Sequence, residues 1–181
     1  MIKGRVIHSL LRMSKNHKKV LAIDPGTREM GIAFFDEGKL IYYGVKTIKK
    51  HRYPNETLKQ GRKIILRLIK DFRPDTLIYE KTFFANNRNS SLLNVFVDEI
   101  RAVARRKGLE VRGFAPSTVK KAVCGNGRAK KREVAKVIAS KYPELKVYLT
   151  QDRAWKEKYH QNMFDAVALG MMVNERSNRP Y

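Results

Sequence analysis

The order of the apolar runs between residues 18 and 115 limits the possible fold more than any other feature of this sequence. The run "KKVLAID" (18–24) is short, apolar and followed by Pro25-Gly26, a pattern typical of a buried strand that ends in a turn. The run "MGIAFFDEGKLIYYGVKTI" (30–48) holds two β-rich halves around the turn-forming residues Asp36, Glu37 and Gly38, and therefore predicts a β-hairpin. Residues 56–72 and 91–108 have the apolar spacing of helices, and short strands follow at 75–80 and 109–115.

A first strand, a hairpin and two helix–strand units predict an α/β fold built on one mixed five-stranded sheet. The hairpin region supplies three antiparallel strands, and each helical crossover adds one parallel strand, so that helices flank the sheet. Towards the C-terminus we expect a short helix capped by Ser117, a break at residues 125–127, a basic helix, an irregular stretch over residues 144–159, and a last helix from Asn162. No repeat or linker interrupts residues 20–176, which we interpret as one domain behind a basic extension, residues 1–19.

The charge balance decides which partners this domain can have. The chain of 181 residues carries 39 Lys and Arg against 17 Asp and Glu, a net charge of +22 that is spread along its length. Such a surface attracts polyanions, above all nucleic acid; an anionic membrane surface or a ribosomal setting is the alternative. A hydrophobic content of 43% excludes a disordered tail, and the lack of a long apolar run argues against a membrane span. The single cysteine, Cys124, excludes an internal disulfide and fits a cytoplasmic protein.

Residues 1–19 carry many bases and no acid, and three interpretations are open. The segment is a nucleic-acid-binding arm, a short organellar targeting segment, or an upstream extension of a protein whose translation starts at Met13. We favour the extension. A secretory signal is excluded because the apolar stretch is short and interrupted.

Three carboxylates are candidates for a metal site. Asp24 and Glu80 each end a predicted strand, and α/β sheets bind ligands at the carboxyl ends of their central strands. Asp165 lies in the last predicted helix on the face of Ala168 and Leu169, which should pack on the sheet and bring Asp165 to the same place. Three carboxylates in one cleft repel one another unless cations bridge them, and oxygen ligands favour Mg²⁺ or Mn²⁺. Two such ions, about 4 Å apart, clamp the attacking and leaving oxygens of a phosphodiester.

Each carboxylate also has a structural explanation. Asp24 fits a turn residue, Glu80 fits an ion pair with Lys81, and Asp165 fits a helix cap or an ion pair on a basic surface. In a chain with so few acids, the three together favour the metal site over three separate structural roles.

Four segments, in order, make the chain resemble the RuvC family of Holliday-junction resolvases in the RNase H-like superfamily. They are "LAIDPGTREMGIAFF", "LIYEKTFFANNRNSS", "STVKKAVCGNGRAKKREV" and "DAVALG", and together they span roughly residues 19–173. The resemblance implies an RNase H-like fold, a two-fold homodimer and two divalent ions. It also implies paired nicks across a four-way DNA junction that leave 5′-phosphates.

The resemblance assigns the metal ligands residue by residue. Asp24, Glu80 and Asp165 match three of the family's ligands. The fourth, commonly Asp or His, lies three residues before the last Asp. Here that position is Asn162, which shares a helix face with Asp165 and offers an oxygen without a charge. His160 is the alternative if the start of the helix shifts.

Basic and aromatic residues complete the predicted DNA interface. Lys120 and Lys131 match family lysines near the scissile phosphate, where they stabilise charge in the transition state. Phe83 matches the family's junction-probing position and can stack on an unpaired base, so Phe84 is the better core candidate. The remaining expected DNA contacts are Asn87, Arg88, Lys121, Arg128, Lys130 and Arg132. A solvated helix face is the structural alternative for the basic run.

The helix at 91–108 carries more apolar residues than one core-facing stripe needs. The surplus predicts a dimer interface, and a two-fold junction that is cut twice also requires two active sites. A helix covered on both sides within one subunit is the alternative.

The expected function is a Mg²⁺-dependent junction resolvase. The alternatives are an RNase H-like nuclease for other branched DNA or structured RNA, and a non-catalytic junction-binding protein, which Asn162 would favour.

Overall fold

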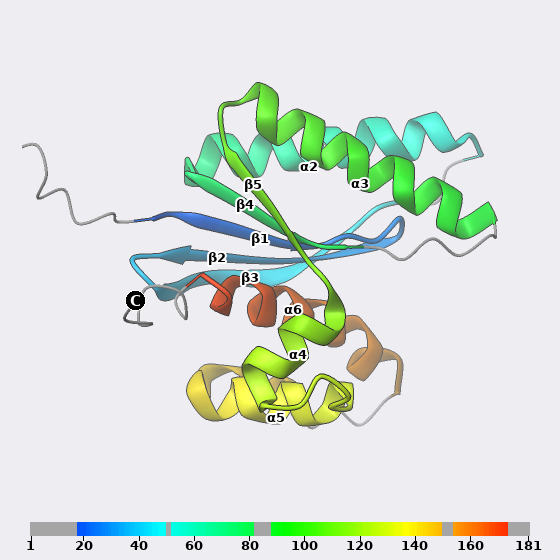
Figure 1. Cartoon of the computed structure of the whole chain (residues 1–181). Coiled ribbons are helices and arrows are strands. Elements are labelled where there is room, and N and C mark those ends of the chain that lie inside the picture. Colours follow the sequence, from blue (N-terminus) through cyan, green and yellow to red (C-terminus); the bar gives the residue numbers. More distant parts are fainter. Residues whose placement is uncertain (1–17, 50–51, 82–87, 150–153, 174–181) are drawn as a thin grey trace, which may run out of the picture.

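The computed structural model of the chain describes residues 18–49, 52–81, 88–149 and 154–173. Within them, a mixed sheet with the strand order β3-β2-β1-β4-β5 separates two layers of helices (Figure 1). This arrangement confirms the five-stranded sheet that the sequence predicts. In this part of the chain, no helix combines the length and the apolar character that crossing a bilayer requires.

The antiparallel half of the sheet consists of β1 (Val20–Asp24), β2 (Glu29–Asp36) and β3 (Lys39–Thr47). Glu37 and Gly38 join β2 to β3 with positive φ angles of 51° and 79°. This left-handed backbone is the conformation that a tight hairpin turn needs. The predicted hairpin is therefore confirmed, and its register places β2 between the other two strands.

The parallel half of the sheet consists of β4 (Thr76–Glu80) and β5 (Glu110–Phe114), which follow β1 in the strand order. The crossovers α2 (Pro54–Phe72) and α3 (Arg88–Arg106) lie side by side on one face of the sheet (Figure 1). Leu21 and Ile23 of β1 are completely buried in the core beneath these helices. Strand alternation sends the residues between them to the other face.

The opposite face of the sheet is covered by α6 (Ala154–Met171), which contacts β1, β2 and β3. Outside α6 lie α4 (Pro116–Cys124), α5 (Lys131–Lys141) and the 3₁₀-helix η1 (Pro143–Tyr148) (Figure 1). Val20 and Ala22 of β1 share this second core with Phe164 and Val167 of α6. Because α6 is enclosed between the sheet and the outer helices, it needs apolar residues around most of its circumference.

The start of α4 differs from the prediction. Ala115, not Ser117, is the N-cap residue, and it makes no side-chain capping bond. Pro116 takes the first helical position, where its fixed φ suits the helix and its missing N–H costs nothing. Proline therefore determines where this helix begins, and Ser117 lies within its first turn.

The stretch predicted as irregular, residues 144–159, is largely helical in the structure. η1 begins at Pro143, and α6 begins at Ala154 rather than at Asn162. The ring of His160 lies against the ring of Tyr148, with centroids 4.7 Å apart. This contact joins two aromatic rings that carry polar atoms. The helical spacing of aliphatic residues, on which the prediction relied, therefore does not indicate it.

Candidate active site

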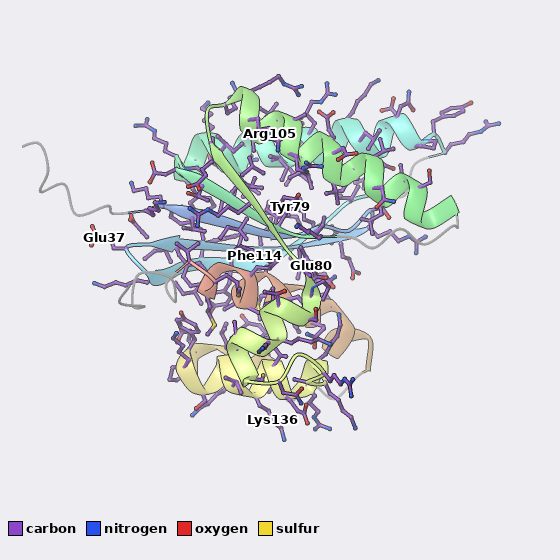
Figure 2. All side chains as sticks on the ribbon, in the orientation of Figure 1. Glu37, Tyr79, Glu80, Arg105, Phe114 and Lys136 are labelled. Atoms are coloured by element: carbon purple, nitrogen blue, oxygen red, sulfur yellow. The ribbon has the colours of Figure 1, made fainter. Side chains whose placement is uncertain are left out.

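The ends of two neighbouring parallel strands bring Asp24 and Glu80 together. In the β1–β4 ladder Ile23 stands beside Tyr79, so the next residue of each strand follows at the same end of the sheet. Figure 2 shows Glu80 at this end, near α4 and α6, and Glu37 at the opposite end. The structure therefore places these two predicted site residues next to each other, as strand-end carboxylates.

A glycine in β2 lets α6 reach the same end of the sheet. A Cβ atom on Gly31 would lie 1.8 Å from the carbonyl oxygen of Asn162 and 3.2 Å from the Cβ atom of Asp24. Gly31 is also the partner of Asp24 in the β1–β2 ladder. The backbone of α6 therefore rests on β2 beside Asp24. Asp165, about one turn later, comes within electrostatic reach of both Asp24 and Glu80.

Burial and mutual repulsion disfavour negative charge at this site. Burial raises the pKa of Asp24 well above its usual value, and repulsion from Asp165 and Glu80 raises it further. The pKa of Glu80 rises to about 7, again from burial first and from repulsion by Asp165 second. Lys131 opposes both of these pKa shifts without cancelling them. Burial and repulsion thus make the ionised form of these carboxyl groups unfavourable. A cation that bridges them would stabilise that ionised form.

Asp165 has the most direct partners of the three carboxylates. Lys131 Nζ donates a hydrogen bond to one carboxylate oxygen at 2.8 Å, and Gln161 Nε2 donates to the other at 2.9 Å. Burial opposes the charge of the Lys131 ammonium, but attraction to Asp165 and the hydrogen bond to it outweigh this, so the pKa of Lys131 is raised. Lys131 thus places a fixed positive charge among the carboxylates.

The other predicted cations lie on α4, α5 and the turn between them. Lys120 is half-buried and opposes the rise in the pKa of Glu80, so it also lies close to the carboxylates. The turn between the helices begins at Gly125, whose φ is 72°, and the Arg128 N–H donates to Asn126 Oδ1 at 2.9 Å. Four of these cations are solvent-exposed, as is the side chain of Lys131: Lys121, Arg128, Lys130 and Arg132. Their role in DNA binding stays a prediction.

Asn162 makes a contact that sequence reasoning missed. Its Nδ2 atom donates to Glu29 Oε2 at 3.4 Å, and Glu29 is the first residue of β2. One signal could have found Glu29: it lies two residues before Gly31, so strand alternation places both on the face of β2 that receives α6. His160, the alternative ligand, uses its ring in packing against Tyr148.

The donor set fits a hard divalent cation. Asp24, Glu80 and Asp165 offer oxygen donors, which Mg²⁺ and Mn²⁺ prefer. Among the residues that the structure describes, no three Asp, Glu, His or Cys side chains already surround a common point. Each oxygen of Asp165 accepts one hydrogen bond, from Lys131 or from Gln161, and keeps a further lone pair that a cation could use.

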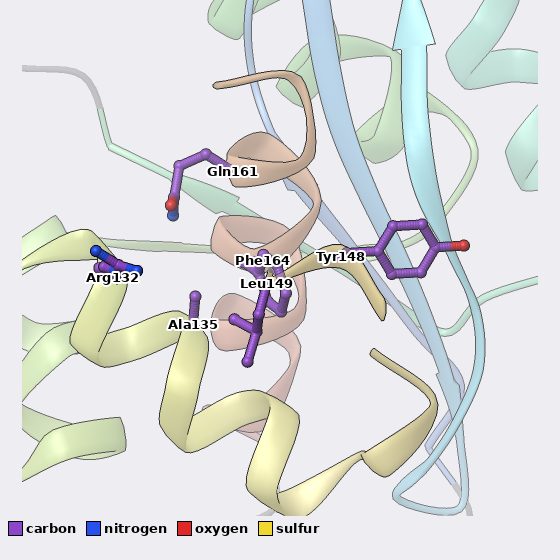
Figure 3. Close-up of a pocket in the computed structure, with 6 residues that line it drawn as sticks. All are labelled: Arg132, Ala135, Tyr148, Leu149, Gln161 and Phe164. Carbon is purple, nitrogen blue, oxygen red and sulfur yellow. The ribbon is translucent and has the colours of Figure 1, made fainter. Parts of the chain in front are cut away.

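A small pocket lies beside Asp165. Its volume is about 90 Å³, and Arg132 of α5 and Gln161 of α6 face each other across it (Figure 3). Gln161, a second residue that sequence reasoning missed, therefore both borders the pocket and holds Asp165. The pocket is far smaller than a site that encloses a nucleotide-sized ligand.

For several predicted residues, the structure describes no side chain. Phe83, Phe84 and Asn87 lie outside the described residues, as does the basic segment 1–17. Arg88 begins α3, and only its backbone is described. Their proposed contacts with DNA stay predictions.

Comparison with known proteins connects this site to one family. The family model described as "Crossover junction endodeoxyribonuclease RuvC" matches residues 20–152. The protein of that name from Chloroflexus aurantiacus is 35% identical over 128 residues, which cover 66% of this chain and 76% of the relative. The one from Rickettsia typhi is 32% identical over 162 residues, which cover 83% of this chain and 92% of the relative.

The fold is also similar to that of a solved structure. The structure of Thermus thermophilus RuvC in complex with Holliday junction substrate superposes with a TM-score of 0.68. It is 21% identical, and the match covers 89% of this chain and 96% of that chain. At this identity the likeness concerns the fold alone. The range that the family model matches contains Asp24 and Glu80 but ends before Asp165, which the geometry of α6 brings to the site.

Proposed function

Because the chain belongs to the RuvC family of crossover junction endodeoxyribonucleases, we propose that it resolves four-way DNA junctions by metal-dependent hydrolysis of the phosphodiester backbone. The observation that carries this proposal is that Asp24 and Glu80 end the neighbouring strands β1 and β4 at the same end of the sheet, with Asp165 in electrostatic reach. The net charge of +22 supports a polyanionic substrate.

Asp24, Glu80 and Asp165 would hold two Mg²⁺ ions, with Mn²⁺ as the alternative, and Asn162 would add a neutral oxygen. When bound, such ions activate water and neutralise charge on the phosphate. The raised pKa values of Asp24 and Glu80 support this assignment, because a divalent cation offsets the negative charge that burial and repulsion disfavour.

Lys131 is proposed to exchange partners during the reaction. Without a cation, its ammonium group neutralises Asp165 at 2.8 Å. If Asp165 held a divalent ion, the Lys131 ammonium group would be able to donate to a phosphate oxygen instead, where it would stabilise the charge that develops in the transition state. Lys120, half-buried near Glu80, would act on the same phosphate from α4.

The exposed cations would hold the DNA arms. Lys121, Arg128, Lys130 and Arg132 lie on or between α4 and α5, next to the two helices that carry Lys120 and Lys131. Contacts of this kind go to phosphates, so they position the substrate without reading its sequence. Phe83 would probe the junction, with Asn87 and Arg88 beside it in sequence.

We also propose a homodimer formed through α3. Phe96 and Ile100 are buried within the subunit, so packing inside the chain accounts for part of the apolar surplus of this helix. Val95, by contrast, is 49% exposed. A two-fold partner would cover it and supply the second active site that paired cuts need. Light scattering should find a dimeric wild type and a monomeric Val95→Asp variant, and a monomeric wild type would contradict the proposal.

Cleavage of an end-labelled four-way junction tests the proposed reaction. The wild-type chain should nick the junction with Mg²⁺ but not with EDTA, and should leave a linear duplex of the same sequence intact. The Asp24→Asn variant should bind the junction but cut it at least 10³-fold more slowly, because it loses a metal ligand.

Two other outcomes would point to different functions. Tight junction binding without cuts in Mg²⁺ or Mn²⁺ would contradict a nuclease and favour a binding protein. Equal cutting of flapped DNA or structured RNA would favour an RNase H-like nuclease with another target.

A further inference from the structure

The position that matches the family's fourth metal ligand carries Asn162, which offers an oxygen but not the negative charge that an Asp at this position would bring. An amide oxygen binds Mg²⁺ or Mn²⁺, but it binds more weakly than a carboxylate and can rotate away. The structure places another carboxylate against this residue. Glu29 Oε2 lies 3.4 Å from Asn162 Nδ2, a hydrogen bond between β2 and α6 that joins residues far apart in the chain.

The backbone holds Glu29 in this place. Glu29 and Gly31 lie on the same face of β2 by strand alternation, and the carbonyl of Asn162 sits directly over Gly31. Gly31 in turn pairs with Asp24 in the neighbouring strand. Glu29 therefore lies at the margin of the carboxylate site and on the same side of the sheet as α6.

The hydrogen bond also fixes how the amide of Asn162 is oriented. An ionised carboxylate can only accept hydrogen bonds, so it selects the orientation in which Asn162 presents nitrogen to it. The amide oxygen of Asn162 is then the atom that remains available to a cation. Glu29 itself makes no salt bridge with any Lys or Arg among the described residues, despite the net charge of +22.

We propose that Glu29 is a positioning residue that completes the altered metal site: it orients the Asn162 amide so that its oxygen serves as a ligand, and it supplies the negative charge that Asn162 lacks. The inference rests on the proposed metal-dependent function. Partners that orient a metal ligand typically contribute about 10- to 100-fold to metal affinity.

Mn²⁺ binding to the full-length, DNA-free chain tests the proposal. Titration followed by the electron paramagnetic resonance signal of free Mn²⁺ gives the affinity without any cleavage. Glu29→Gln should weaken binding by about tenfold or more. The matched control is Glu37→Gln, which removes the same charge just beyond the other end of β2 and should leave the affinity unchanged.

A second substitution separates positioning from folding. In the Asn162→Asp background, which restores the charged ligand, Glu29→Gln should cost little affinity. Such a rescue cannot come from an unfolded chain. The proposal would be overturned if Glu29→Gln left the Mn²⁺ affinity unchanged, or if Glu37→Gln lowered that affinity equally. It would also be overturned if Glu29→Gln lowered the affinity equally in both backgrounds, or if the wild type did not bind Mn²⁺.

Junction cleavage by the same preparations separates this inference from the proposed function. A wild type that binds Mn²⁺ and cuts junctions, with Glu29→Gln unaltered in affinity, overturns only the role of Glu29. A wild type that binds Mn²⁺ through Glu29 but cuts nothing overturns the nuclease and leaves the metal site in place.

Discussion

Replacing Glu80 by glutamine should stabilise the metal-free protein at alkaline pH. Glu80 has its pKa raised from 4.5 to about 7, chiefly by burial and then by repulsion from Asp165. The folded protein therefore holds the Glu80 proton more tightly than the unfolded chain does. This contribution to stability is complete below pH 4.5 and is lost as the pH rises through about 7. Glutamine resembles the protonated acid and does not ionise, so the variant keeps this contribution to stability at high pH.

The size of the effect follows from the shift. At about 1.4 kcal/mol per pKa unit, Glu80→Gln should gain about 3 kcal/mol of unfolding free energy at pH 8 and well under about 1 kcal/mol at pH 4.5. Urea unfolding in EDTA at the two pH values measures the difference. Glu56→Gln, on the exposed start of α2, is the matched control and should change stability by at most about 0.5 kcal/mol.

Two results would refute this reasoning. If Glu80→Gln is no more stable than the wild type at pH 8, ionised Glu80 does not destabilise the folded protein. An equal gain at both pH values would assign the effect to packing rather than to ionisation.

Three further predictions concern other parts of the site. Lys131→Met should slow single-turnover junction cleavage about 10²-fold with junction affinity nearly unchanged, and equal slowing in the control Lys130→Met would contradict a specific role. Gly31→Ala should lower the unfolding free energy by about 1–3 kcal/mol, because its Cβ would lie 1.8 Å from the carbonyl oxygen of Asn162; an unchanged urea midpoint would disprove the contact. Junction affinity should fall steeply with salt, and Lys121→Ala should reduce the slope of log affinity against log salt by about 1; an unchanged slope would remove it from the interface.

The sheet was predictable because turn residues and the spacing of apolar residues, both local features of the sequence, indicate how its strands are connected. The turn at Asp36–Gly38 specifies the hairpin, and helical runs between short strands favour parallel crossovers. Asp24 and Glu80 were visible for the same reason, since each ends an apolar run. Asp165 followed from the apolar face of its own helix, although the start of that helix was predicted too late.

The contacts of the site with distant residues were not predictable. Glu29 and Asn162 are joined across 133 positions, and Lys131 and Asp165 across 34, and no local period encodes such pairs. The first contact depends on how closely α6 approaches β2 at Gly31, and the second on how α5 packs against α6. The sequence therefore specifies the strand-end carboxylates, whereas the tertiary packing of α6 and α5 determines their partners.

The most direct test of the account uses a supercoiled plasmid that extrudes a cruciform, which is a four-way junction in closed circular DNA. Paired cuts across the junction convert the plasmid directly to linear molecules, whereas unpaired cuts leave nicked circles. We expect Mg²⁺-dependent linear product from the wild type and intact supercoiled plasmid with Asp24→Asn. Nicked circles alone, or linear product from the Asp24→Asn variant, would contradict a resolvase that acts through these carboxylates.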